Sequence, residues 1–256
     1  MTDSPPRDLI GSLLKGLDVM AILAAQPAGM TLTEMATAAG LTRAGARRML
    51  LTLAASGYVR QDGRQFMLTP KLLTLARQWL DGSSLWSFAE PHMRAVAATL
   101  KESCSAAVLA DEDVVYVARV PGERIMRVAL NVGTRLPAYC TSMGRVLLSG
   151  LGEEELRRFL ARARISARTE KTVTDRDALF AEIRQAAAEG YASVDEELEI
   201  GLRSIAVPIR DRSGTVVAAV NVSTQSARYS VAAMKREILP LLKQAAGEIE
   251  AFFALQ

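Results

Sequence analysis

The sequence predicts an α+β protein of two domains, a small helical domain ending in a β-hairpin and a larger domain with one central sheet. Two helix-start signals followed by a turn lie between Thr31 and Leu68. The chain has 256 residues, enough for two domains. Beyond residue 100, β-rich runs are followed by helical runs and then by β-rich runs again. That order is typical of an α+β domain with a mainly antiparallel sheet.

Two short helices are expected in the first of these regions. Thr31 and Glu34 have the spacing of a capping box, so one helix begins there and stops near Gly40. Thr42 caps a second helix that runs to about Ser56. Apolar residues recur at helical spacing along it and predict its buried face: Ala46, Met49, Leu50 and Leu53.

A hairpin should follow, with strands over 58–61 and 64–68 and with Asp62-Gly63 as its two-residue turn. Helix, tight turn, helix and hairpin is the plan of a winged helix-turn-helix, whose second helix enters the DNA major groove. A basic helix face is often only a solvated surface, but here no acidic residue occurs between Glu34 and Asp62. We therefore predict DNA contacts from the start and exposed side of the second helix and from the hairpin: Thr42, Arg43, Ala44, Arg47, Arg48, Arg60 and Arg64.

The flanking segments complete the predicted N-terminal half. Residues 1–8 are expected to form a flexible tail. A helix over 9–26 should pack behind the winged domain (9–69) through Leu13, Leu17, Met20 and Ala24. A linker helix begins at Thr69-Pro70, with Pro at its first position, and residues 81–84 are polar and rich in Gly and Ser. We assign 70–84 to this linker and joint, and 85–256 to the second domain.

The second domain should begin with a helix over 85–101. Three strands are then expected over 104–110, 114–120 and 125–130, and three helices over 141–151, 153–162 and 175–189. Further strands are expected over 191–194, 203–210 and 216–224. Ser230 should cap a long final helix that is kinked at Pro240.

Composition and charge exclude several classes of protein. Half the residues are hydrophobic and 23% are charged, and no apolar run approaches the roughly 20 residues that cross a bilayer. The N-terminus does not resemble a secretory signal, and two cysteines do not make a disulfide framework, so we expect a cytoplasmic protein with no membrane partner. One histidine and no Cys/His cluster argue against a metal site, and no cofactor is predicted. Residues 1–80 carry nine Lys/Arg and five Asp/Glu, whereas the remainder carries 22 and 23, so the basic excess belongs to the N-terminal half.

Two groups of reactive side chains are candidates for catalysis, and neither has the partners that catalysis needs. Cys140 and Ser142 lie at a helix start but have no evident base, and His92 is expected to be a partly buried helix residue. The acidic run at 195–199 lacks histidine and favours a solvated or interface loop over a metal or acid/base cluster.

Three separated segments resemble the IclR family of bacterial transcription regulators. They are the helix-turn-helix stretch, Leu136-Pro137 through Gly144-Arg145-Val146-Leu147-Leu148, and Gly190-Tyr191 with Asp195-Glu196-Glu197 and Gly201-Leu202-Arg203. The phrases LTRAGARRMLLTL and IGLRSIAVPI resemble members that control aromatic-acid catabolism through the β-ketoadipate pathway. The resemblance implies a GAF/profilin-like effector-binding fold for the second domain. It also implies a homodimer or dimer of dimers, with Trp79 of the linker helix as a subunit contact.

A small organic anion is the expected effector. Residues 139–144 form a loop entering a helix, and unpaired N–H groups at such an end suit a carboxylate, which points to Thr141, Ser142, Met143 and Gly144. The resemblance adds Ser204, Asn221 and Ser223, although these polar groups could instead bond to neighbouring backbone or water. Val194 stands where some relatives place a ligand-contacting Asp, so the pocket should favour a larger, aromatic body. The candidate counter-ions are Arg127, Arg135 and Arg203.

The sequence therefore predicts a ligand-responsive regulator that binds double-stranded operator DNA of pseudo-palindromic sequence and responds to a small aromatic or dicarboxylic acid. An enzyme acting on a small carboxylate, with the N-terminal domain as an interaction module, is the alternative from another class. A sequence-independent DNA binder of the nucleoid type is a third reading, and the modest net charge of +3 counts against it.

Overall fold

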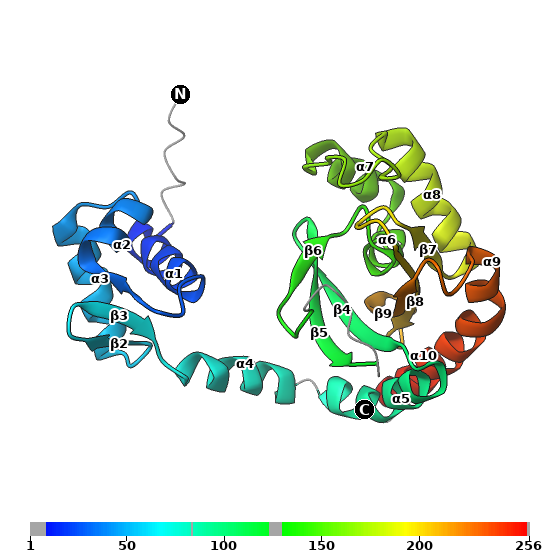
Figure 1. The fold of residues 1–256 in the computed structure, drawn as a ribbon, viewed down its shortest axis with the longest axis horizontal. Helices are drawn as coiled ribbons and strands as arrows, with labels where there is room; N and C mark the ends of the chain where they lie inside the picture. Colours follow the sequence, from blue (N-terminus) through cyan, green and yellow to red (C-terminus); the bar gives the residue numbers. More distant parts are fainter. Residues whose placement is uncertain (1–8, 83, 123–129, 255–256) are drawn as a thin grey trace. The chain divides into compact units, whose positions relative to one another are not determined.

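The computed structural model describes residues 9–82, 84–122 and 130–254, and these form two compact units that divide between Gly82 and Ser83 (Figure 1). We call them the N-terminal unit and the C-terminal unit. The predicted tail over 1–8 lies outside the described residues.

The N-terminal unit has the predicted order of helix, helix-turn-helix and hairpin. The Thr31 N–H donates to Glu34 Oε2 at 2.7 Å and the Glu34 N–H donates to Thr31 Oγ1 at 3.3 Å, so the capping box is confirmed. Thr42 Oγ1 accepts the Gly45 N–H at 3.1 Å and begins the next helix, as predicted. The elements are α1 (Gly11–Ala24), β1 (Met30–Thr31), α2 (Leu32–Ala38), α3 (Arg43–Ala55), β2 (Val59–Asp62), β3 (Gln65–Leu68) and α4 (Lys71–Gly82).

The hairpin differs from its prediction in two details. Asp62 pairs with Gln65, so the two-residue turn is Gly63-Arg64 and not Asp62-Gly63. Gly63 has a φ of +57°, which suits a hairpin turn with glycine at its first central position. The hairpin also gains a third strand that was not predicted, because β1 pairs with β3 and gives the order β1-β3-β2.

The buried face of α1 was predicted wrongly. The helix packs through Val19 and Leu23, while Leu13 and Leu17 are 60% and 54% exposed. Apolar residues occur on more than one side of this helix, so periodicity alone could not select the face that packs on α3.

The predicted loop between the domains is largely helical. Helix α4 continues through Gly82 and α5 (Ser84–Leu100) begins two residues later, so the polar, small residues at 81–82 extend a helix. The side chain of Trp79, predicted as a subunit contact, lies outside the described residues.

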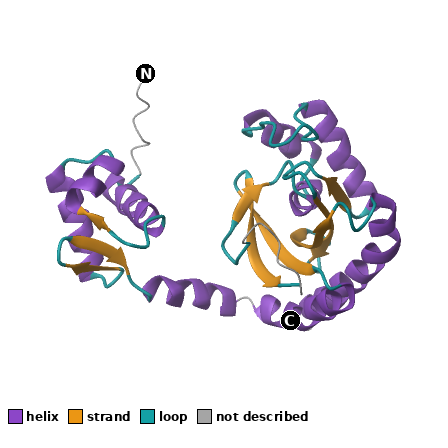
Figure 2. Ribbon diagram, in the orientation of Figure 1, coloured by secondary structure: helices purple, strands orange, loops and turns teal. Residues whose placement is uncertain are grey.

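The C-terminal unit is built on a six-stranded antiparallel sheet of order β6-β5-β4-β9-β8-β7 (Figure 2). Its strands are β4 (Ser103–Ala110), β5 (Asp113–Val120), β6 (Arg135–Pro137), β7 (Ala192–Asp195), β8 (Leu202–Arg210) and β9 (Val216–Gln225). Its other elements are α6 (Ser142–Ser149), α7 (Glu153–Arg162), α8 (Arg176–Glu189), the short α9 (Val231–Ala233), a π-helical turn (Met234–Ile238) and α10 (Leu239–Ala254).

Helices cover both faces of this sheet. Helices α5 and α10 pack on one face, and α6, backed by α8, packs on the other. Alternate residues of each strand point to opposite faces, so the long apolar runs of β8 and β9 serve two cores.

Strand β6 was not predicted, and the expected strand over 125–130 falls mostly on residues 123–129, outside the described part of the chain. Ser230 caps the final helical segment as predicted, with Oγ accepting the Ala233 N–H at 3.1 Å. The backbone next to Pro240 rearranges into the π-helical turn just before it, a common response where a proline removes an N–H donor. Within the described residues, no helix is long and apolar enough to cross a membrane.

Candidate functional site

A groove runs between α3 and the hairpin of the N-terminal unit. Arg43 and Arg47 contribute to it from α3, and Gln61, Gly63 and Arg64 contribute from the hairpin and its turn. Thr31, Leu32, Thr33, Leu51 and Phe66 complete its lining. Both helix arginines and Arg64 are exposed, so the groove is a cationic surface that brings together three of the predicted DNA-contacting side chains.

The remaining predicted contacts lie outside that groove. Thr42, the N-cap residue of α3, is exposed, and so are Ala44 and Arg48 on the helix. Arg60 lies on β2, where its guanidinium reaches Asp62 Oδ2 at 3.5 Å and Met67 Sδ at 3.4 Å. The ion pair is exposed and therefore weak, so it does not prevent Arg60 from meeting a phosphate.

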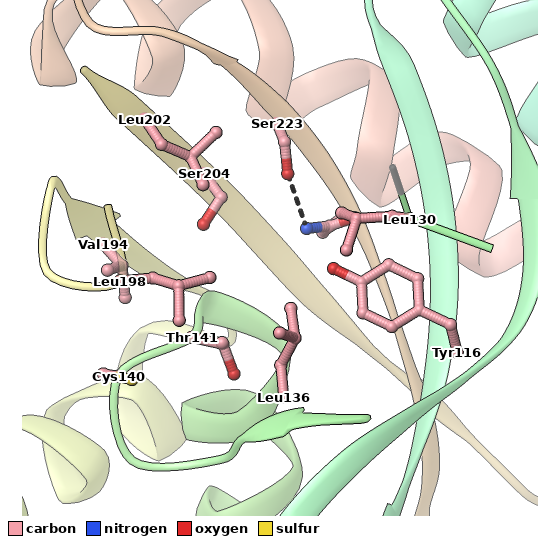
Figure 3. Close-up of a pocket in the computed structure, with 11 residues that line it drawn as sticks. Tyr116, Leu130, Leu136, Cys140, Thr141, Val194, Leu198, Leu202, Ser204 and Ser223 are labelled. Atoms are coloured by element: carbon pink, nitrogen blue, oxygen red, sulfur yellow. Dashed lines mark hydrogen bonds between the residues drawn. The ribbon is translucent and has the colours of Figure 1, made fainter. Parts of the chain in front are cut away.

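An internal cavity lies between the sheet and α6 of the C-terminal unit (Figure 3). The space open to the centre of a water molecule is about 20 Å³, so a ligand larger than water must move the lining side chains. The lining residues are Tyr116, Leu130, Leu136, Cys140, Thr141, Val194, Leu198, Leu202, Ser204, Asn221 and Ser223.

Polar groups gather on the sheet side of this cavity. The Asn221 Nδ2 group donates to Ser223 Oγ at 3.1 Å, drawn as a dashed line in Figure 3. The Asn221 Oδ1 atom is buried and has no hydrogen-bond partner among the described residues. A buried carbonyl without a donor is uncommon in native proteins and indicates a place where a polar ligand or water binds.

The structure brings together part of the predicted effector set. Thr141, Ser204, Asn221 and Ser223 line the cavity, together with Val194. Ser142 is fully buried beside it, and its hydroxyl has no partner among the described residues. Met143 and Gly144 do not line the cavity.

Met143 and Gly144 have packing roles instead. Met143 lies in the core between α6 and the sheet. A Cβ on Gly144 would lie 2.0 Å from the Ala138 carbonyl oxygen, so glycine permits the close approach of α6 to the loop before it.

Two of the three cations predicted from sequence are engaged elsewhere. Arg203 donates to Asp195 Oδ1 at 2.5 Å and Oδ2 at 3.1 Å and to the carbonyls of Ser226 and Tyr229. Arg135 pairs with Asp113 at 3.0 Å. Arg127 lies outside the described residues.

The acidic segment at 195–199, expected to be a solvated or interface loop, is tied into the C-terminal unit through Glu197. Glu197 is buried, and its Oε2 accepts from Arg145 Nη2 at 2.7 Å and from the Val173 N–H at 3.1 Å. Burial raises the pKa of Glu197, while the Arg145 guanidinium opposes that rise. This ion pair ties the segment to α6.

Six of the lining residues were not proposed from sequence: Tyr116, Leu130, Leu136, Cys140, Leu198 and Leu202. The Tyr116 hydroxyl points into the cavity in Figure 3, and burial raises its pKa to about 12. A single tyrosine within a valine-rich run was the only sequence signal for it.

Cys140, one of the two candidate nucleophiles, and His92, the only histidine in the sequence, do not form a nucleophile–base pair. Burial raises the pKa of the Cys140 thiol to about 11, which favours the unreactive thiol over the thiolate. His92 Nδ1 lies 2.7 Å from Glu248 Oε2, a contact between α5 and α10.

Comparisons with known proteins match both units. The IclR helix-turn-helix domain matches residues 12–63, and the bacterial transcriptional regulator IclR C-terminal domain matches residues 77–251. The Pca regulon regulatory protein of Pseudomonas putida is 42% identical over 94% of this chain and 84% of its own length.

Solved structures agree with these matches. A Rhodococcus sp. RHA1 protein assigned as a transcriptional regulator is 46% identical, with a TM-score of 0.84 over 96% of this chain and 99% of that one. An IclR homologue from Microbacterium hydrocarbonoxydans, crystallised with 4-hydroxybenzoate, is 26% identical, with a TM-score of 0.83 over 96% of this chain and all of its own.

Proposed function

This chain belongs to the IclR family of bacterial transcriptional regulators, and from that premise we propose that it binds a pseudo-palindromic operator as a homodimer and responds to a small aromatic or dicarboxylic acid. The N-terminal unit reads the DNA, and the cavity of the C-terminal unit holds the acid.

The groove between α3 and the hairpin supports the DNA-binding half of this proposal. An arginine can grip guanine O6 and N7 with two hydrogen bonds, and others can hold phosphates. Arg43 and Arg47 extend from the helix expected in the major groove, and Arg64 extends from the turn of the wing. We propose that Thr42, Ala44, Arg48 and Arg60 contribute at the edges of this surface.

The cavity supports the effector half. Its sheet side offers Asn221, Ser223 and Ser204, and its other walls are mostly leucine and valine. A flat aromatic ring would fit between the apolar walls, and a polar group at one end of the ligand would meet the polar sheet side. The relative from Microbacterium binds 4-hydroxybenzoate, and the Pseudomonas relative is named for the pca regulon, so we propose an effector and target genes of aromatic-acid catabolism.

An apolar stripe on α1 supports self-association. Five large apolar side chains of the segment that leads into and through this helix are at least 44% exposed: Leu9, Ile10, Leu13, Leu14 and Leu17. A contiguous exposed stripe of this kind is typical of a protein interface. A two-fold dimer formed through this stripe would provide two DNA-binding units for the two half-sites of an operator.

The alternative of an enzyme acting on a small carboxylate gains no support. The relatives are regulators, Cys140 is held as a buried thiol, and His92 is occupied by Glu248 on the opposite face of the sheet from the cavity.

Fluorescence anisotropy with operator DNA selected from genomic fragments tests the DNA-binding assignment. Arg43→Ala and Arg47→Ala in the full-length protein should each weaken operator binding by about 5- to 150-fold, equivalent to about 1–3 kcal/mol for a lost base contact. Arg94→Ala removes one exposed positive charge from the C-terminal unit and serves as the matched control. Full-strength binding by an Arg43→Ala/Arg47→Ala double variant would overturn the assignment.

A further inference from the structure

Arg119 is a half-buried cation on β5 beside the cavity. Its Nη1 donates to Ser105 Oγ at 3.1 Å and its Nη2 donates to Ser103 Oγ at 3.2 Å. Both serines are buried. Among the described residues, no carboxylate pairs with this guanidinium, and burial lowers the pKa of Arg119.

Three other arginines of the C-terminal unit, each with a side chain no more than 30% exposed, pair with carboxylates. Arg145 meets Glu197 at 2.7 Å, Arg203 meets Asp195 at 2.5 Å and Arg228 meets Glu102 at 2.7 Å. Desolvating a guanidinium is costly unless an opposite charge lies beside it, and these three follow that rule. Arg119 has two neutral hydroxyls instead, which leaves its charge available to an anion.

A β-bulge turns Arg119 toward the same face as Tyr116. Ser105 pairs with Arg119, whereas Ala107 pairs with Tyr116, because the register of β4 and β5 shifts between Ala106 and Ala107. Residues three apart on a regular strand point to opposite faces. The extra residue in β5 cancels that alternation, so Tyr116 and Arg119 share the face that carries the cavity.

The strand on the other side of β4 places the polar end of the cavity next to this cation. Ser103 pairs with Ser223, and Ser105 pairs with Asn221. Side chains of directly opposed residues lie on one face and about 5 Å apart at their Cβ atoms. The two serines that hold Arg119 are therefore immediate neighbours of Asn221 and Ser223, which line the cavity and include the unpartnered Asn221 Oδ1.

The opposite end of the cavity is less suited to a carboxylate. Thr141 Oγ1 already accepts the Gly144 N–H and donates to the Pro137 carbonyl, both at 3.1 Å. Leu136 and Leu198 lie beside it. An aromatic ring fits between such side chains, and a hydroxyl substituent rather than a charge fits near Thr141.

We infer that Arg119 is the residue that binds the effector's carboxylate and so makes this cavity specific for acids. This inference rests on the proposed function and adds its anion-selecting residue. The acid enters with its carboxylate toward the guanidinium of Arg119 and the second N–H of Asn221 Nδ2, and with its ring toward the leucines. The lining side chains move outward to admit it, because the cavity itself has room for about one water.

Isothermal titration calorimetry on the full-length protein tests this with a matched pair of ligands. The probes are 4-hydroxybenzoate and its neutral isostere 4-hydroxybenzamide. Wild-type protein should prefer the acid by about 10- to 100-fold, the range of a charge-assisted hydrogen-bonded contact. Arg119→Gln keeps a hydrogen-bond donor for Ser103 and Ser105. In this variant the affinities for 4-hydroxybenzoate and 4-hydroxybenzamide should differ by less than about threefold, and the affinity for the amide should change little.

Two further variants make the result specific. Arg157→Gln removes an exposed positive charge from α7 and should leave the acid preference intact. Arg119→Lys keeps the positive charge but loses the planar guanidinium that donates to both oxygens of a carboxylate, so it should retain part of the preference for the acid. The same variant provides the test if Arg119→Gln does not fold.

The outcomes separate this inference from the proposed function. Acid preference that persists in Arg119→Gln, or is lost fully in a folded Arg119→Lys, would overturn the role of Arg119 and leave the regulator assignment standing. Wild-type protein that binds neither 4-hydroxybenzoate nor protocatechuate nor β-ketoadipate would overturn the proposed effector class, and this inference with it.

Discussion

Arg145 lies at the centre of a buried ion-pair network in the C-terminal unit. Its side chain is 4% exposed and meets Glu197 at 2.7 Å and Glu182 at 2.6 Å, and its Nε donates to the Tyr139 carbonyl. These contacts join α6, α8 and the segment after β7 around the cavity. The sequence could not reveal the partner of Glu197 in this acidic run, because Arg145 lies 52 residues earlier in the chain.

Removing Arg145 should therefore destabilise the protein strongly. Arg145→Ala leaves Glu197 buried without its counter-charge, a change that costs about 3–5 kcal/mol in the free energy of unfolding. Urea unfolding of the full-length protein measures it. Arg157→Ala, which breaks an exposed pair with Glu153, should cost less than about 1 kcal/mol. Equal losses for the two variants would show that the network is not a buried ion pair.

The capping box of α2 operates at the scale of one element. Its hydrogen bonds to Thr31 lower the pKa of the Glu34 carboxyl, with the Thr31 backbone as the larger cause. Because the folded pKa lies below the unfolded value, the carboxylate stabilises the helix above that unfolded value. The stabilisation is lost as the pH falls through the folded pKa.

An NMR titration of the Glu34 side chain checks this directly. Its pKa should lie below 4.5 in the native protein. Thr31→Ala should raise that pKa, because the hydroxyl that donates to Glu34 Oε2 is removed, and should cost about 1 kcal/mol of cap stability. An unchanged titration in the variant would contradict the reciprocal capping geometry.

Helix α6 depends on a glycine for its position. Gly144→Ala would place a Cβ 2.0 Å from the Ala138 carbonyl oxygen and 2.4 Å from its Cα, so backbone must move. We expect the free energy of unfolding, measured by thermal unfolding, to fall by about 1–3 kcal/mol or more. Gly247→Ala in α10, where no atom lies within 4 Å, should instead be neutral or raise stability by up to about 1 kcal/mol. Tolerance of both substitutions would contradict the close approach of α6.

Helices and strands differ in how far the local sequence predicts them. Elements with local signals were predicted well, as with the caps at Thr31, Thr42 and Ser230. The short strands β1 and β6 have only two and three residues and depend on partners distant in sequence, so no local pattern marks them.

The candidate cavity shows a similar division. Asn221 and Ser223 interrupt an apolar run and could be proposed from sequence. Arg119 could not, because its orientation depends on a bulge opposite Ala106 and Ala107, and bulges arise from strand pairing rather than from local composition.

At the scale of the whole molecule, the proposed binding of a pseudo-palindromic operator requires a dimer. Leu13→Glu and Leu17→Glu place charges in the exposed stripe of α1 without touching its buried side chains, Val19 and Leu23. Analytical ultracentrifugation should show a shift toward monomer, and operator affinity should fall because two linked half-site readers gain from effective concentration. A double variant that stays dimeric with full operator affinity would exclude this stripe as the interface.

The N-terminal unit alone should bind operator far more weakly than the full chain for the same reason. A fragment covering residues 1–82 retains the groove but loses the C-terminal unit. Anisotropy titrations of both proteins on one operator measure the ratio. Equal affinities would count against the dimeric mode of binding.

Operator affinity measured with and without an aromatic acid tests the central claim most directly. The result depends both on DNA binding by the N-terminal unit and on acid binding by the C-terminal unit. Anisotropy isotherms of the full-length protein on operator DNA should shift by about 5- to 150-fold when 4-hydroxybenzoate or protocatechuate is added at saturation. By linkage, operator DNA should change the affinity for the acid by the same factor. Superimposable isotherms in the presence of an acid that calorimetry shows to be bound would contradict a ligand-responsive regulator.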